Sequence, residues 1–421
     1  MDHTSTASEK GPGTPPIARP LWRNADFLLL WSGQLISTLG TSVSGLALPL
    51  LILALTRSPA QAGLFAAVRQ LPYLLISLPA GALIDRWDRK RTMICCDLLR
   101  WLALGSVPLA FALGHLTLLQ LYLVALFEGS AYVLFSLAQI SALPHVVAPQ
   151  QLPRAYALDT TTEYTGTLLG PGLGAFIIGL APAVQVGAII GYLVDSASYL
   201  FSGLSLLRVR ASFQVASADH GAPRRLYHEI IEGLRFLWRQ RVLRLLALLT
   251  ALVNFLLSPL ELALIIRAQG QLHLSVQFVG LIFSVGGLGG ILGGLLAPWL
   301  HARLRGGQIL GASLFVWIGA ALLLALSPWP GSLLIGKFLF SFSWPAYGVT
   351  VVTYRLRQTP DALQGRVNSA FRNLTYGSEP LGSALGGLLL VTLDVRAVFG
   401  LITAGLAAAL LLAACTRLRK I

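Results

Sequence analysis

Long runs of apolar residues, separated by short polar stretches, make up nearly the whole chain. A helix needs about 20 residues to cross the hydrocarbon core of a bilayer, whereas a barrel strand needs about 9 to 11. The runs here are too long for barrel strands, and only helices and closed barrels satisfy every backbone group in lipid. We therefore predict an all-α polytopic membrane protein with twelve transmembrane helices in two bundles of six. The helices are predicted within Phe27–Leu55, Ala62–Ile84, Thr92–Leu113, Leu116–Leu143, Ala155–Leu180, Val184–Leu207, Leu243–Ile266, Phe278–Leu300, Ile309–Leu326, Gly331–Val352, Val367–Leu393 and Val398–Ala414.

Polar segments divide the chain into four predicted regions. Residues 1–24 are rich in Pro, Gly and polar residues and hold no apolar core of the signal-peptide kind, so we predict a disordered cytosolic tail. The first six-helix bundle is predicted at 25–207, a cytosolic linker at 208–241 and the second bundle at 242–421.

The predicted linker contains one amphipathic stretch. Leu226, Ile230, Leu234 and Leu237 recur at helical spacing, while charged residues fall elsewhere on the same helix. This pattern predicts a helix near the lipid headgroups that connects the two bundles. Binding of a regulatory protein is the alternative function for such a helix.

Composition and the placement of charge agree with a membrane protein. Hydrophobic residues make up 55% of the chain and charged residues 11%, with a mean hydropathy of +0.72, whereas soluble domains carry about 25% charged residues. The net charge of +14 could suggest a nucleic-acid partner, but most of the 31 Lys and Arg residues fall in alternate loops on one face. By the positive-inside rule this face is cytosolic. The sequence thus predicts the cytoplasmic membrane, both termini in the cytosol, and no nucleic-acid partner.

The sequence holds no pattern typical of an enzyme or a metal site. Its three cysteines lie in or beside apolar runs without metal-ligand spacing, and its histidines show no pairing. We find no phosphate-binding loop and no combination of nucleophile, base and orienting residue. We therefore expect a protein that is not an enzyme, with no bound cofactor or metal.

A dense cluster of charges lies between the second and third apolar runs. Residues 81–91, GALIDRWDRKR, hold four cations and two carboxylates, which must form a tight loop at one membrane face. The simplest interpretation is a cytosolic anchor. The pattern Gly-x-x-x-Asp-Arg-x-x-Arg-Lys also closely resembles the signature loop between helices 2 and 3 of the major facilitator superfamily of secondary transporters. The resemblance implies a gating role for Gly81, Asp85, Arg86, Arg89 and Lys90.

A second motif, GTLLGPGLGA, lies in the fifth apolar run. Gly166, Gly170 and Gly174 are spaced by four residues and would form a smooth ridge, and Pro171 interrupts the hydrogen-bond ladder. Close helix packing is one explanation. The motif also resembles the glycine-proline signature of proton-coupled exporters in the same superfamily, so export is the implied direction.

The chain as a whole resembles the branch of drug:proton antiporters that contains enterobactin exporters and macrolide efflux pumps. Two positions depart from related patterns, because Thr41 follows Gly40 where many relatives have an acidic residue, and Ala125 replaces an arginine that several antiporters carry in helix 4. These departures put the proton route of the well-known antiporters in doubt for this chain.

An internal repeat relates the two predicted bundles. Arg154, Gly170 and Gly174 recur at one fixed offset as Arg366, Gly382 and Gly386. Transporters built from repeated halves hold their substrate near the middle of the membrane, between the halves.

Ionisable residues inside the apolar runs are the candidates for binding protons or substrate, because a charge at mid-bilayer costs about 2.5 to 3.5 kcal/mol. Glu128, Asp195 and Glu379 lie nearest the centres of their runs, and Glu163 lies closer to the cytosolic end. We expect Arg69 to pair with a carboxylate such as Glu128, and for Asp195 a structural hydrogen bond to neighbouring serines is the alternative.

The sequence therefore predicts a monomeric secondary transporter that exports a small amphiphilic compound, a drug or a siderophore, by alternating access, with the proton gradient as its driving force. Two alternatives stay open: an importer or facilitator of the same fold, and a membrane sensor or scaffold that binds ligand without transport.

Overall fold

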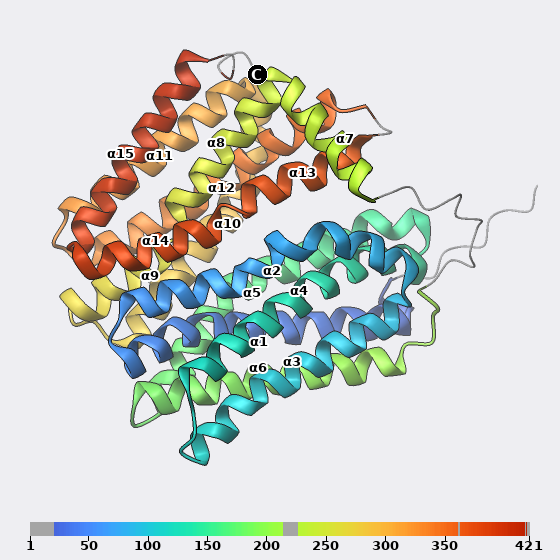
Figure 1. Cartoon of the computed structure of the whole chain (residues 1–421), viewed down its shortest axis with the longest axis horizontal. Helices are drawn as coiled ribbons and strands as arrows, with labels where there is room; N and C mark the ends of the chain where they lie inside the picture. Colours follow the sequence, from blue (N-terminus) through green and yellow to red (C-terminus); the bar gives the residue numbers. More distant parts are fainter. Residues whose placement is uncertain (1–20, 214–225, 361–362, 417, 419–421) are drawn as a thin grey trace, which may run out of the picture.

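The computed structural model describes residues 21–213, 226–360, 363–416 and 418, and within these ranges the chain is helical and holds no strand (Figure 1). The predicted N-terminal tail falls mostly outside this range. In chain order the helices are η1 Leu21–Arg23, α1 Ala25–Thr56, α2 Pro59–Arg86, α3 Arg89–Ala112, α4 Leu118–Val146, η2 Pro149–Gln151, α5 Leu152–Leu180, α6 Val184–Arg208, α7 Leu226–Arg239, α8 Arg241–Leu257, α9 Leu260–Ile266, η3 Arg267–Gln271, α10 Val276–Arg303, α11 Gly306–Leu326, α12 Gly331–Gln358, α13 Gln364–Tyr376, α14 Glu379–Thr392 and α15 Val395–Cys415.

Polar residues next to the apolar runs set where the first helices begin. The Asn24 side chain accepts a hydrogen bond from the Phe27 amide at 3.1 Å and caps α1. Ser58 caps α2, whose first residue, Pro59, needs no hydrogen-bond acceptor for its backbone nitrogen. Such caps fix the short turns that reverse the chain between long helices.

Two of the predicted helices are broken in the structure, where the sequence had predicted continuous ones. The run predicted as Leu243–Ile266 divides into α8 and α9 at Ser258, because Pro259 lacks an amide hydrogen and cannot continue the ladder. The run predicted as Val367–Leu393 divides into α13 and α14 around Gly377, and Pro380 lies in the first turn of α14.

The helices pack as two groups, with α1–α6 on one side and α8–α15 on the other (Figure 1). In the first group α6 packs against α1 and α3, while α4 packs against α2 and α3. In the second group α12 packs against α10 and α11, and α15 packs against α11. Contacts between the groups are made chiefly by α2 with α14 and by α5 with α10.

We call the end of the helices nearest residues 87–88 and 209–213 the linker end, and the opposite end, which holds residues 57–58 and 327–330, the distal end. Helix α7 lies at the linker end beside α13, where Glu232 and Arg366 form an ion pair. Of the linker helix, the side chains before residue 231 lie outside the described part of the chain.

Eight helical segments of the described residues are long and apolar enough to cross a membrane. Helices cover every one of the twelve predicted runs. The number of crossings and the side on which the termini lie stay predictions.

Candidate functional site

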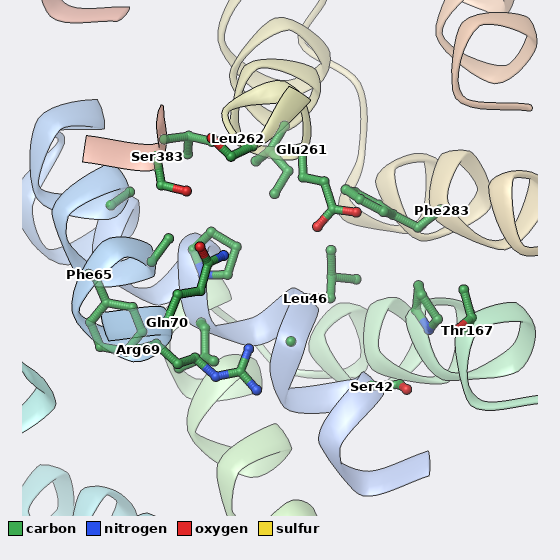
Figure 2. Close-up of a pocket in the computed structure, with 18 of the residues that line it drawn as sticks. Ser42, Leu46, Phe65, Arg69, Gln70, Thr167, Glu261, Leu262, Phe283 and Ser383 are labelled. Carbon is green, nitrogen blue, oxygen red and sulfur yellow. The ribbon is translucent and has the colours of Figure 1, made fainter. Parts of the chain in front are cut away.

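A cavity of about 330 Å³ lies between the two groups of helices. Helices α1, α2 and α5 line it from the first group, and α9, α10, α12 and α14 from the second. Figure 2 shows side chains from both groups directed into this central space. Most of its walls are apolar, and the residues that give it charge are Arg69, Glu261 and Lys337.

Arg69 and Glu128 form an ion pair that joins α2 to α4. Nε of Arg69 lies 2.7 Å from Oε2 of Glu128, and Nη2 lies 3.5 Å from Oε1. The pairing expected from the sequence is therefore confirmed. The Glu128 side chain is only 8% exposed and does not line the cavity, whereas Arg69 is 32% exposed and does. The Arg69 guanidinium therefore lines the cavity, and the buried Glu128 carboxylate, which does not line it, forms the ion pair with Arg69.

A second ion pair, between Glu261 and Lys337, lies in the opposite wall of the cavity. Nζ of Lys337 is 2.8 Å from Oε1 of Glu261 and 5.0 Å from the centre of the Phe283 ring. The Glu261 side chain is 64% exposed and that of Lys337 is 13% exposed, so the carboxylate is the accessible partner. The sequence candidates did not include either residue. Two opposite charges in apolar runs were the signal that could have found them.

The other carboxylates predicted from the sequence do not line the cavity. Glu379 is half-buried at the start of α14, and Glu163 is exposed on α5. Asp195 is 1% exposed and accepts hydrogen bonds from Ser44 and from Ser198. Of the hydrogen bonds from neighbouring serines that were the structural alternative for Asp195, the one from Ser198 is present, and Ser44 of α1 supplies another. Across the described residues, His, Cys, Asp and Glu form no group of three that could hold a metal ion.

The glycine ridge of α5 packs against α1. A Cβ added to Gly170 would lie 2.1 Å from Cβ of Ser42, so only glycine permits this approach. Gly166 and Gly174 face α1 in the same way. Pro171 lines the cavity, so the motif contributes both to the packing of α5 against α1 and to the cavity wall.

The charged loop at the linker end is held within the first group of helices. Asp88 caps α3 through a 3.0 Å hydrogen bond from the Arg91 amide. Arg89 donates to the Phe213 carbonyl at 3.1 Å, and Lys90 donates to the Val209 carbonyl at 2.6 Å. These contacts connect the loop to the segment that leaves α6 toward the linker. For Gly81, Asp85 and Arg86 only the backbone is described, as the end of α2, so their predicted gating role stays a prediction.

The two groups approach each other most closely toward the distal end. A Cβ added to Gly63 of α2 would lie 2.5 Å from the Ser383 carbonyl oxygen and 2.6 Å from Cα of Gly387, both on α14. Backbone contact of this kind joins α2 to α14 beside the cavity, which Ala62 and Ser383 line.

Two further charged residues, which the sequence candidates also omitted, are buried inside the first group. Asp97 and Arg100 of α3 are 0% and 3% exposed, and neither lines the cavity. They follow the charged loop within a few residues, so in the sequence they resemble the foot of a helix at the membrane surface.

Comparisons with known proteins agree with this arrangement. The family model described as Major Facilitator Superfamily matches residues 30–378. The chain is 28% identical over 392 residues to the multidrug efflux pump Tap of Mycobacterium tuberculosis, covering 90% of each chain. It is 25% identical over 409 residues to the enterobactin exporter EntS of Citrobacter koseri, covering 94% of this chain and 93% of the relative.

Among solved structures, the chain shares its fold with a bacterial homologue of the iron transporter ferroportin in an inward-facing state. The TM-score is 0.75 at 18% identity, covering 94% of this chain and 99% of that one. The nucleoside transporter NupG gives a TM-score of 0.73 at 14% identity, covering 92% of this chain and 98% of that one. With the family model matched over most of its length and the fold shared from end to end, the chain belongs to the Major Facilitator Superfamily of membrane transporters.

Proposed function

We propose that this transporter exports small amphiphilic compounds, drugs or siderophores, across the cytoplasmic membrane in exchange for protons, and that it works as a monomer with both termini in the cytosol. One observation carries the proposal: the cavity between the two groups of helices combines apolar walls with an ion pair on each side. Such a site suits a molecule that has both an apolar body and a polar or charged group.

The proposed direction of transport rests on where the two groups of helices are in backbone contact. The backbones of α2 and α14 are in contact toward the distal side, at Gly63 and Gly387. A compound would enter from the linker end, which the distribution of Lys and Arg predicts to be cytosolic. Release on the distal side would then require α2 and α14 to separate. The names of the multidrug pump and the enterobactin exporter support this direction and this class of compound.

Proton coupling would act through buried carboxyls that charge and discharge during the cycle. A proton on Glu128 would remove the negative charge that holds Arg69, and Arg69 would then be free to pair with a group in the cavity. Glu379, Asp195 and Glu163 are the remaining candidates predicted from the sequence, and we retain them as variants to test.

The test is transport by the purified protein in liposomes. A panel of lipophilic cations, macrolides and catecholate siderophores is offered with and without an imposed pH gradient. We expect at least one compound to move against its own gradient, and a protonophore to stop the movement. The Gly319→Ala variant is the control, because its added methyl group meets nothing within 4 Å and should leave transport unchanged.

Other outcomes would replace the proposal with an alternative. Movement that ignores the pH gradient would identify a facilitator, and gradient-driven uptake would identify an importer. Binding of a compound without any movement would identify a sensor or scaffold.

A further inference from the structure

Asp97 and Arg100 form a charged cluster inside the first group of helices, away from the cavity. They lie one turn apart on α3, which packs between α4 and α6. Yet no ion pair joins them in this conformation, although both are almost completely buried. Two buried groups of opposite charge that do not bond to each other require a physical explanation.

The surroundings of Asp97 favour a neutral carboxyl. Helix α6 lies directly over it, since a Cβ added to Gly203 would be 3.5 Å from Cβ of Asp97. The Ser202 hydroxyl of α6 lies beside the carboxyl, but neither carboxyl oxygen meets hydrogen-bond geometry with any partner among the described residues. Burying an ionised carboxylate without a partner costs several kcal/mol of desolvation free energy. A proton bound to Asp97 removes this cost.

The surroundings of Arg100 favour a charged guanidinium that does not need Asp97. Its Cζ lies 4.8 Å from the ring centre of Tyr199, 5.4 Å from that of Phe135 and 5.5 Å from that of Tyr132. Arginine stays protonated in proteins, and aromatic faces stabilise a desolvated cation. Nε and Nη2 have no hydrogen-bond partner in the described part of the chain, so they are available to an acceptor.

One contact connects this cluster to the wall of the cavity. The hydroxyl groups of Tyr199 and Thr41 are 2.7 Å apart, and Thr41 precedes Ser42, which lines the cavity. The ring that covers Arg100 is therefore bonded to α1 at the level of the cavity. A change in the position of Arg100 would alter how Tyr199 packs against α1.

We propose that Asp97 is a proton-binding site of the first group of helices, neutral in the described conformation and paired with Arg100 after it releases the proton. The proposal deepens the proposed proton coupling and rests on it for its role in transport. The titratable and charged groups around Asp97 and Arg100 are Cys96 on α3, Glu128 and Tyr132 on α4, and Asp195 and Tyr199 on α6. Of these, Glu128 is already engaged by Arg69, and Asp195 by two serines.

The experiment is infrared difference spectroscopy of the purified transporter, titrated from about pH 5 to about pH 9. We expect a carboxyl C=O band that is lost as the pH rises in the unmodified protein and that is missing in Asp97→Asn. Gly319→Ala is the control, because its added methyl group meets nothing within 4 Å, and it should keep the band. Asp97→Glu should keep a titrating band at a shifted frequency, and it answers the question if the asparagine variant does not fold.

The outcomes separate this proposal from a fixed charge pair. If Asp97→Asn still shows the pH-dependent carboxyl band of the unmodified protein, or if Asp97→Glu does not change the frequency of that band, Asp97 does not titrate and the proposal is wrong. A permanently ionised pair would instead show no such band, and Asp97→Asn would lose stability that Asp97→Asn combined with Arg100→Gln recovers. The infrared titration needs no transported compound. A titrating Asp97 in a protein that moves nothing would leave this site standing and overturn the proposed export.

Discussion

The contact between Gly63 of α2 and Gly387 of α14 gives the sharpest test of alternating access in this chain. In Gly63→Ala, the added methyl carbon would lie 2.5 Å from the Ser383 carbonyl oxygen and 2.6 Å from Cα of Gly387. Ordinary contacts between such atoms begin near 3.4 Å, so the two helices must separate by roughly 1 Å. The atoms on α14 belong to the backbone and cannot turn away as a side chain could.

The cost falls on only one of the two proposed states. Overpacking a close contact costs about 1 to 3 kcal/mol. In the proposed state that opens to the distal side this contact is absent. The overpacking therefore raises the free energy of the distal-closed state alone and changes the ratio of the two states by the full amount. Because about 1.4 kcal/mol is a factor of ten, the distal-closed population should fall about 5-fold to 150-fold relative to the distal-open one. Gly387→Ala adds a methyl group to the same contact from the other helix, 2.7 Å from Cα of Gly63, and should shift the ratio in the same direction.

Distances between spin labels measure this ratio directly. We would place labels at Leu113 and Leu326, both exposed at the distal ends of α3 and α11, after replacing the three cysteines. Gly63→Ala should move the distance distribution toward longer values, and Gly319→Ala, whose methyl group meets no atom within 4 Å, should not. Identical distributions in a folded Gly63→Ala protein and the Gly319→Ala control would refute the view that this contact closes the distal side.

Three further predictions follow from the charged residues. Arg69→Gln should lower the free energy of unfolding by about 3 to 5 kcal/mol, because it leaves the buried Glu128 carboxylate unpaired, and Glu128→Gln should lower it less, because Arg69 is partly exposed to the cavity. The double variant should be less destabilised than the two single variants added together; thermal unfolding in detergent measures this, and simple additivity would show that the pair contributes nothing. Glu379→Gln, like Glu128→Gln, should permit transport that no longer follows the pH gradient, and normal gradient-driven pumping by both in liposomes would remove these residues as proton sites. Asp85→Asn should slow transport and leave ligand binding unchanged, which binding and flux measured on the same preparation would reveal; unchanged flux would mean that the loop is only an anchor.

The ion pair of Arg69 and Glu128 could be predicted because the membrane leaves few choices. Two opposite charges in separate apolar runs must find partners, and each run holds few other polar groups. The same rule did not select Glu261 and Lys337, because both lie close to the ends of their apolar runs, where a charged side chain can reach the membrane surface. Pro259 breaks the helix predicted for the first of those runs and begins a new one whose first turn directs Glu261 toward the cavity. A helix break changes which side chains face inward, and hydrophobic runs alone do not locate it.

Asp97 and Arg100 were missed for a different reason. Asp97 lies fewer than two turns beyond the charged loop and Arg100 about two and a half turns beyond it, where a surface position satisfies the same sequence pattern. Whether such residues face lipid headgroups or the interior depends on the rotation of α3 about its axis, which its neighbours α4 and α6 determine. This rotation is set by tertiary packing, so the sequence of α3 alone does not specify it.

The two halves of the internal repeat differ in where their helices are interrupted. Helix α5 and the α13–α14 pair occupy corresponding positions in the internal repeat, yet α5 is continuous through Pro171 whereas its counterpart is interrupted at Gly377. The joint at Ser258 lies in the same second half. The second half therefore contains two helix breaks, at Ser258, which lines the cavity, and at Gly377, whereas the helices of the first half that line the cavity, α1, α2 and α5, are continuous. Because the backbone hydrogen-bond ladder is already interrupted at these two joints, we expect helix bending during transport to occur in the second half of the chain.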